Sequence, residues 1–409
     1  MKKNILTVGL VIITFGLMLF YYSQSAKDRI YVGSAYRSDQ AKNYAQYMNA
    51  KKSLLVKLDK RGQILSAVEF DQDYSWATIT PDGNKILCKA DYLTMDWHRD
   101  YVIIDLITGD QYKSPATQLV MREHTILTNN MIGAAWLDSV ALYDMQYSPL
   151  NINLDFDSGQ KLAFNEESFI YENFITGIEF DEQNQRFIVS WAQNMNQEEY
   201  FAINKLGISI FDYSGQLIAK KILPEQYMSP YSRNLRYIMP NQIKLLNSKW
   251  LLMEAMNKDY QPFMLLMNME NGEINQYPYL DHILYQYSRI FKKDNNLYTS
   301  LYEELDTNFF TLLVNVSNGQ AKILKTFPNQ LVTAANNNPK KSEIFHPYDA
   351  VLNGKQGYIA ASDEEPYFTT TGLFYWEKNK YTLIHQLPSS GYFNLISMDV
   401  EGNCLLLIW

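Results

Sequence analysis

Ile79-Thr80-Pro81-Asp82-Gly83-Asn84-Lys85-Ile86-Leu87 places β-forming residues on either side of a Pro-Asp-Gly-Asn cluster. Short Asx and Gly residues tolerate the reversed backbone of a tight turn, so this stretch predicts an antiparallel hairpin with a short apolar outgoing strand. Outgoing strands of the same kind occur at seven places: 86–90, 131–136, 187–191, 251–255, 297–301, 357–361 and 404–409.

A second kind of hairpin alternates with the first. Its turn is a Gly followed by a polar residue, and Gly takes the positive φ that a tight hairpin requires. Six places have this turn, and Lys378-Asn379-Lys380 supplies a seventh without Gly: Gly62-Gln63, Gly109-Asp110, Gly159-Gln160, Gly215-Gln216, Gly272-Glu273 and Gly319-Gln320. The spacing of roughly 50 residues predicts a repeated unit of two hairpins, which is a four-stranded blade.

The two ends of the chain carry complementary half-units. The chain opens with a Gly-type hairpin, Ser53 to Phe70, and closes with one of the other type, Phe393 to Trp409. Pairing the last strand with the first closes a ring and leaves no open sheet edge at the junction. We therefore predict an all-β fold, a seven-bladed β-propeller closed by N- and C-terminal half-blades, with six or eight blades or another all-β architecture as alternatives.

The stretch from Ile79 to Leu87 is similar to the Ser-Pro-Asp-Gly repeat of TolB-like bacterial propellers, and the layout resembles the WD40 and YVTN-type propeller superfamily. The Trp-Asp dipeptide of WD40 blades and the Asp-box of sialidases are not found. The resemblance implies a propeller from Ser53 to Trp409 and implies no activity.

The N-terminus predicts membrane attachment. Lys2 and Lys3 precede an uncharged run from Ile5 to Tyr22, near the lower limit for a membrane span. We favour a retained signal-anchor helix over a signal peptide cut at Ser23-Gln24-Ser25. The expected organisation is a membrane or signal segment (1–22), a polar stalk (23–51) with a short helix at 39–48, and the propeller (52–409). The propeller should lie outside the membrane, at the cell surface or in the periplasm, or be secreted if the segment is cleaved.

The charge of the chain argues against one class of partner, and its two cysteines predict free thiols. The net charge of −8 and the lack of a basic run argue against a nucleic-acid partner. Cys88 and Cys404 are expected in equivalent strands of the first and last blades, offset by about 10 Å along the strand, whereas a disulfide needs Cα atoms within about 7 Å. We expect two separate buried thiols.

Long loops rich in acidic and aromatic residues indicate a binding face. In a propeller, the loops between second and third strands and those between blades share one face, opposite the tight hairpins. Carboxylates converging there would attract a cationic peptide, a basic protein patch or a sugar, although acids that merely solvate loops are the alternative. The candidate residues are Trp97, His98, Asp100, Glu198, Glu199, Tyr200, Tyr260, Glu303, Glu304, Asp363, Glu364, Glu365 and Tyr367.

Catalytic motifs and cofactor motifs are not found, and we predict neither a cofactor nor a metal. Trp97-His98 could stack on a ligand and exchange a proton, but packing within the loop is favoured. The other histidines, at 124, 282, 346 and 385, lack zinc-site spacing. Asp155-Phe156-Asp157-Ser158-Gly159 with Glu166 partly mimics a calcium loop, but its Gly belongs to the hairpin series and a plain turn is favoured.

The sequence thus predicts a membrane-tethered extracytoplasmic binding or scaffold module that recognises a protein, peptide or glycan through its long-loop face. The alternative is a propeller-based hydrolase or lyase whose site lies at the central channel, with His98 or His346 near carboxylates.

Overall fold

The computed structural model describes residues 29–31, 53–70, 74–90, 101–114, 123–135, 138–163, 169–193, 205–228, 243–257, 262–278, 289–293, 296–303, 308–315, 320–326, 330–335, 338–352, 356–363, 370–378, 380–388, 393–399 and 401–408. The regular elements in these ranges are β-strands. Among them no helix has the length and apolar character needed to span a bilayer. The predicted membrane segment, 1–22, and the predicted stalk helix, 39–48, lie outside the described residues.

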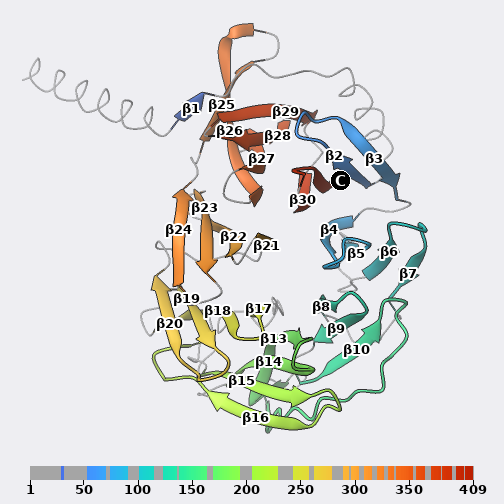
Figure 1. Cartoon of the computed structure of the whole chain (residues 1–409), viewed down its shortest axis with the longest axis vertical. Coiled ribbons are helices and arrows are strands. Elements are labelled where there is room, and N and C mark those ends of the chain that lie inside the picture. Colours follow the sequence, from blue (N-terminus) through green and yellow to red (C-terminus); the bar gives the residue numbers. More distant parts are fainter. Residues whose placement is uncertain are drawn as a thin grey trace, which may run out of the picture.

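Successive antiparallel sheets follow one another around a ring, with the strands of each sheet stepping outward from the middle (Figure 1). This is the architecture of a β-propeller. One sheet shows the pattern clearly: β13 (Asn173–Asp181), β14 (Arg186–Gln193), β15 (Lys205–Asp212) and β16 (Leu217–Ile222) pair in that order. The side chains of β13 are buried throughout, whereas those of β16 are exposed, because β13 is the inner strand and β16 the outer edge.

Three further sheets repeat this order of four strands. The first comprises β4 (Tyr74–Ile79), β5 (Lys85–Ala90), β6 (Tyr101–Asp105) and β7 (Gln111–Lys113). The second comprises β17 (Ile243–Asn247), β18 (Trp250–Met256), β19 (Pro262–Asn268) and β20 (Ile274–Pro278). The third comprises β21 (Arg289–Lys293), β22 (Asn296–Glu303), β23 (Asn308–Asn315) and β24 (Gln320–Thr326).

The two ends of the chain share one sheet. Its strands are β3 (Ile64–Glu69), β2 (Leu54–Leu58), β31 (Cys404–Ile408) and β30 (Phe393–Met398), in that order. β2 and β31 are antiparallel, with Leu55 opposite Leu407. Both side chains are buried, so the junction between the termini is part of the apolar core. The predicted pairing of the terminal hairpins is confirmed.

The sheet that comes before β30 in the chain has six strands, more than any other sheet in the described residues. It has the order β1 (Arg29–Tyr31), β25 (Gln330–Ala335), β26 (Asn338–Leu352), β27 (Gln356–Asp363), β28 (Thr370–Glu377) and β29 (Lys380–Pro388). The first half of β26 pairs with β25, and its second half pairs with β27. β1, which falls within the predicted stalk, pairs with β25 in parallel.

One predicted hairpin is wrong. Gly159 does not join two paired strands; instead β10 turns back much earlier, between Asp144 and Ser148. The Asp144 Oδ1 atom accepts the backbone N–H groups of Gln146 and Ser148, each at 2.8 Å, and this bonding forms the turn without a Gly. The strands concerned are β8 (Glu123–Thr128), β9 (Met131–Ala135) and β10 (Val140–Asp144), which form a three-stranded sheet, and β11 (Lys161–Ala163) and β12 (Phe169–Tyr171), which pair with each other.

The other thirteen predicted hairpins are confirmed by strand pairing. The core lies between neighbouring sheets: one cluster, for example, joins Val56 of β2, Tyr358 of β27 and Leu406 of β31. Cys88 and Cys404 are buried, unbridged and in different clusters, which agrees with the expectation of separate thiols.

Candidate functional site

The predicted long-loop face lies mostly outside the described residues. Glu303 and Asp363 are the exceptions: Glu303 ends β22 and Asp363 ends β27, where the connections to β23 and β28 begin. Their backbone partners are Asn308 and Phe345. The residues outside the described ranges are Trp97, His98, Asp100, Glu198, Glu199, Tyr200, Tyr260, Glu304, Glu364, Glu365 and Tyr367. The acidic face therefore stays a prediction.

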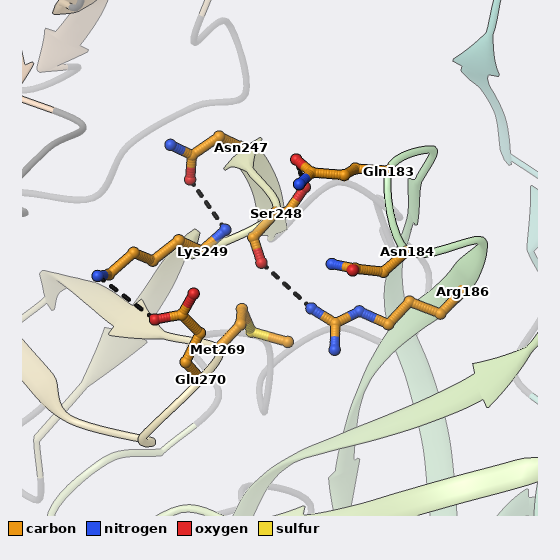
Figure 2. A pocket seen from close by; sticks show the side chains of 8 residues that line it. All are labelled: Gln183, Asn184, Arg186, Asn247, Ser248, Lys249, Met269 and Glu270. Carbon is orange, nitrogen blue, oxygen red and sulfur yellow. Dashed lines mark hydrogen bonds and ion pairs between the residues drawn. The ribbon is translucent and has the colours of Figure 1, made fainter.

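A pocket of about 330 Å³ lies on the opposite side, where tight turns of two neighbouring sheets meet. It is formed by the turn after β13, the turn after β17 and the turn after β19, and Figure 2 shows its side chains. The lining residues are Gln183, Asn184, Arg186, Asn247, Ser248, Lys249, Met269 and Glu270.

Arg186 ties the two sheets together across this pocket. Its Nε atom lies 2.9 Å from Oδ2 of Asp181, and a terminal nitrogen donates to the carbonyl oxygen of Ser248 at 3.1 Å. Burial alone would raise the pKa of Asp181, but side-chain hydrogen bonds from Asn184, Ser248 and Arg186 outweigh it and hold the pKa below its usual value. Asp181 is thus an ionised carboxylate that holds the guanidinium of Arg186 in place without lining the pocket itself.

The turn after β17 is held by its own Asn. Oδ1 of Asn247 accepts the backbone N–H groups of Lys249 at 3.0 Å and Trp250 at 2.9 Å. The hydroxyl of Ser248 donates to Oε1 of Gln183 at 2.8 Å and makes a second link between the sheets. This bonding pre-forms the wall of the pocket before any ligand is present.

A more exposed ion pair borders the pocket. Nζ of Lys249 lies 3.4 Å from Oε2 of Glu270, and the two side chains are 39% and 66% exposed, respectively. Solvent and salt screen such a pair, so each partner can exchange the other for a charged ligand at little cost.

The sequence contains no motif that predicts this pocket. Glu182-Gln183-Asn184 precedes the predicted outgoing strand 187–191 and indicates only a turn. Gln183 and Ser248 are 65 residues apart and meet only because their sheets are neighbours in the ring. A repeat alignment that compared equivalent turns in adjacent blades is the signal that could have found them.

The inner strands give limited support to a catalytic site. His346 lies on β26, and its Nε2 atom is buried with no hydrogen-bond partner among the residues that the structure describes. Asp349, three residues on, uses Oδ2 to accept the N–H of Leu395 at 2.8 Å and Oδ1 to accept that of Ala350 at 2.9 Å. The carboxylate of Asp349 therefore bonds to the backbone through both of its oxygens.

The remaining described histidines are part of the packing. The ring of His124 stacks on Tyr101, with centroids 4.1 Å apart, and its Nδ1 lies 2.9 Å from the hydroxyl of Tyr147. His385 is buried and bonds to a carbonyl oxygen. Within the described residues no group of three His, Cys, Asp or Glu side chains is arranged to hold a metal ion.

The segment that mimics a calcium loop is bonded as a turn. Oδ1 of Asp157 accepts the N–H of Gly159 at 3.0 Å, and Oδ2 lies 3.5 Å from Nζ of Lys220 on the neighbouring sheet. Glu166 lies outside the described residues.

No protein-family model and no curated protein sequence matches this chain. Among solved structures it is similar to a prolyl endopeptidase, with 9% identity and a TM-score of 0.43 over 90% of this chain and 55% of that one. It is also similar to the β-propeller domain of the Trilobed protease from Pyrococcus furiosus, with 10% identity and a TM-score of 0.43 over 80% and 86% of the two chains.

A third similar structure is the periplasmic gluconolactonase of Pseudomonas aeruginosa, with 10% identity and a TM-score of 0.45 over 82% of this chain and 96% of that one. The chain spans just over half the length of the prolyl endopeptidase. Likeness at this level carries no activity over, and the propeller architecture rests on the strand pairing.

Proposed function

We propose that this chain is a membrane-tethered extracytoplasmic recognition module built on a seven-bladed propeller of the TolB-like or WD40-YVTN-like kind. Seven sheets of three or more strands in the described residues, and the pairing of β2 with β31, support the blade number and the closed ring. The uncharged run from Ile5 to Tyr22 supports the membrane anchor.

The observation that carries the proposal is the pocket between the turns of two neighbouring sheets. Its lining combines a guanidinium, an ammonium and three amides, and it includes neither an imidazole nor a thiol. The one hydroxyl, on Ser248, donates to the amide oxygen of Gln183, and the Asp181 carboxylate beside it is held ionised by its hydrogen bonds from Asn184 and Arg186. Glu270, the carboxylate of the lining, is paired with Lys249, so the pocket is better suited to binding than to general acid–base or nucleophilic chemistry.

The partner we propose is a protein, peptide or glycan outside the cell, held mainly by the acidic long-loop face. The positions of Glu303 and Asp363, at the ends of β22 and β27, support this proposal. An opposite-charge partner would be attracted there, and the attraction would weaken with salt.

The test is capture of partners from solubilised membranes with the full chain as bait. A variant with Glu303, Glu304, Asp363, Glu364 and Glu365 changed to Gln or Asn should lose its partner at low salt, while the parent chain retains it. Retention of every captured partner by the variant would contradict recognition through the long-loop face. Carbonate extraction of the full chain and of a chain lacking residues 1–22 tests the anchor separately.

A hydrolase or lyase at the central channel is the second candidate, and the unpartnered Nε2 of His346 is the observation in its favour. This candidate requires turnover of an ester, lactone or uronide substrate that is lost in His346→Gln while the fold is retained. Turnover that survives the substitution would remove His346 from the reaction.

A further inference from the structure

We infer that the pocket formed by the turns after β13, β17 and β19 binds a carboxylate group, with Arg186 as its anchor. The inference rests on the proposed recognition function and names the ligand chemistry of one of its sites. It follows from three properties of the pocket: the hydrogen bonds left unmade, the placement of charge and the size.

The first property is a surplus of hydrogen-bond donors. A guanidinium has five N–H bonds, and Arg186 uses two of them, one to Asp181 and one to the carbonyl oxygen of Ser248. The other terminal nitrogen of Arg186 points away from Ser248 (Figure 2). The amide nitrogens of Gln183 and Asn247 have no partner within the described residues either. A ligand in this pocket therefore meets N–H groups that await an acceptor.

Most acceptors beside these donors are already occupied. Oδ1 of Asn247 accepts hydrogen bonds from two backbone N–H groups, and Oε1 of Gln183 accepts one from the hydroxyl of Ser248. The carbonyl of Ser248 takes the guanidinium. A ligand rich in donors would find few partners, whereas a ligand rich in acceptors would satisfy groups that otherwise depend on water.

The second property is where the charges lie. The Asp181 side chain is 1% exposed, whereas that of Arg186 is 20% exposed, so the cation and not its counter-ion faces the pocket. Lys249 adds a second cation whose partner Glu270 is 66% exposed and easily displaced. The positive charges of Arg186 and Lys249 balance the negative charges of Asp181 and Glu270. A ligand with a single negative charge is therefore better matched than a doubly charged phosphate.

The third property is size. A volume of about 330 Å³ is near the lower end of the range for small-ligand pockets, about 300–1,000 Å³. It accommodates an acidic side chain or one sugar ring and not an extended segment. Arg presents a planar fork that suits a carboxylate, which makes it the anchor of the pocket.

The experiment is calorimetric titration of the detergent-solubilised full chain with matched acid and neutral probes. N-acetyl-glutamate amide is compared with N-acetyl-glutamine amide, and glucuronate is compared with glucose. At least one acid should bind at least tenfold more tightly than its neutral counterpart, and its affinity should fall with salt. The stronger of the two acids identifies a peptide or a sugar as the source of the carboxylate.

Variants identify the anchor. Arg186→Gln should weaken acid binding at least tenfold, and Arg186→Lys, which keeps the charge without the fork, should weaken it less. Lys249→Gln should weaken it several-fold and removes no contact between the sheets, so it tests the site even if Arg186→Gln unfolds. Arg61→Gln is the matched control, because Arg61 is an exposed arginine in the turn after β2, whose side chain contacts none of the pocket residues.

Equal affinity for an acid and its amide, unchanged affinity in Arg186→Gln and Lys249→Gln, or tighter binding of inorganic phosphate than of either acid would overturn the inference. These results are independent of partner capture. Failure of the proposed function would appear as no partner recovered by the full chain, while failure of this inference would appear in the titrations alone.

Discussion

The imidazole Nε2–H of His385 donates to the carbonyl oxygen of Gly62, 2.6 Å away and 323 residues earlier in the chain. Gly62 forms the turn between β2 and β3, and its φ is +78°. A Cβ at this position would lie 2.9 Å from Nε2 of the same histidine. The β2–β3 hairpin therefore packs closely against β29, the edge strand of the neighbouring sheet.

This contact predicts a pH-dependent stability. Burial lowers the pKa of His385, although the bond to Gly62 opposes the shift. Below about pH 6.5 the unfolded chain therefore binds a proton that the folded protein takes up only at lower pH. The free energy of unfolding should fall from about pH 6.5 towards the folded pKa, by at most about 1.4 kcal/mol per pH unit from this group, and His385 should contribute no slope at higher pH.

His385→Gln isolates this contribution, because Gln can donate to the same carbonyl but does not titrate. Urea unfolding at about pH 7.5 should show the variant about 1–2 kcal/mol less stable. Between about pH 7.5 and about pH 5.5 it should lose less stability than the parent chain. Equal losses in the two proteins would show that His385 does not carry the effect.

Lys57 and Asp399 make a second contact across the junction of the termini, and they predict a difference between two substitutions. Nζ of Lys57 lies 3.0 Å from Oδ2 of Asp399, and Oδ1 of Asp399 accepts the backbone N–H groups of Glu401 and Asn403. Asp399→Ala loses both functions and should cost about 2 kcal/mol. Asp399→Asn keeps the backbone bonds of the turn and loses the partly exposed ion pair and the bond that Oδ2 accepts from the Asn403 side chain at 2.9 Å, so it should cost about 1 kcal/mol.

Denaturant midpoints of the two variants and of Lys57→Met test this prediction. Lys57→Met should cost less than Asp399→Asn, since it removes the ion pair and keeps the bond from Asn403 to Oδ2 of Asp399. If Asp399→Asn were as damaging as Asp399→Ala, the charge and not the turn bonding would dominate at this junction.

The alternation of two hairpin types was enough to predict this junction from the sequence, because register and turn chemistry are local properties of the chain. The same pattern wrongly predicted a hairpin at Gly159, and the cause is again found in the local sequence. In the turns that begin at Asp59, Asp212 and Asp399, the Asp carboxylate accepts the N–H groups two and four residues on. Asp144 does the same, and Tyr147 takes the positive φ, 61°, where the other turns have Gly. The Asp, rather than the Gly, marks the turn.

The close approach of Gly207 to Trp191 predicts that one added methyl group at position 207 strongly destabilises the fold. They are opposite each other on β15 and β14, and a Cβ at 207 would lie 2.2 Å from the indole ring. The ring is held by its bond to Ser209 at 2.9 Å and by Nζ of Lys220, which lies 4.9 Å from the ring centroid. Gly207→Ala should cost about 2–3 kcal/mol, because the buried indole has to move.

Gly133→Ala is the matched control for this substitution. Its Cβ would approach Leu127 at 3.1 Å, an apolar side chain that can shift by a few tenths of an ångström. The cost should be about 1 kcal/mol and the near-ultraviolet circular dichroism should not change. A smaller cost for Gly207→Ala than for Gly133→Ala would mean that the indole is free to rotate.

The hairpin pattern alone did not predict the pocket, because its residues become neighbours only when two sheets pack together. Gln183 and Ser248 are far apart in the chain, and neither belongs to a motif. The charge and aromatic pattern of the long loops is, by contrast, visible in the sequence, but most of those residues lie outside the described ranges. Local turn chemistry is readable from one chain, whereas side chains that meet across blades are not.

Glu179 on β13 and Lys244 on β17 connect the inner strands of the same two sheets, and they predict a stability loss that depends on pH. Oε1 of Glu179 lies 2.8 Å from Nζ of Lys244, and the carboxylate is buried. Burial raises the pKa of Glu179 despite the opposing effect of the lysine. Lys244→Met removes the cation and leaves a carboxylate that is costly to ionise.

At about pH 7.5 the Lys244→Met variant should lose about 2–3 kcal/mol, less than a fully buried pair because the lysine is partly in solvent. Because the folded pKa of Glu179 is raised, the folded state holds the proton more tightly, and the loss should shrink as the pH falls through that pKa. Glu179→Gln combined with Lys244→Met should restore most of the stability at about pH 7.5 and remove the pH dependence. Urea unfolding of the parent chain and the two variants at about pH 7.5 and about pH 5 measures this, and a loss that is the same at both would show that removing Lys244 leaves the pKa of Glu179 unchanged.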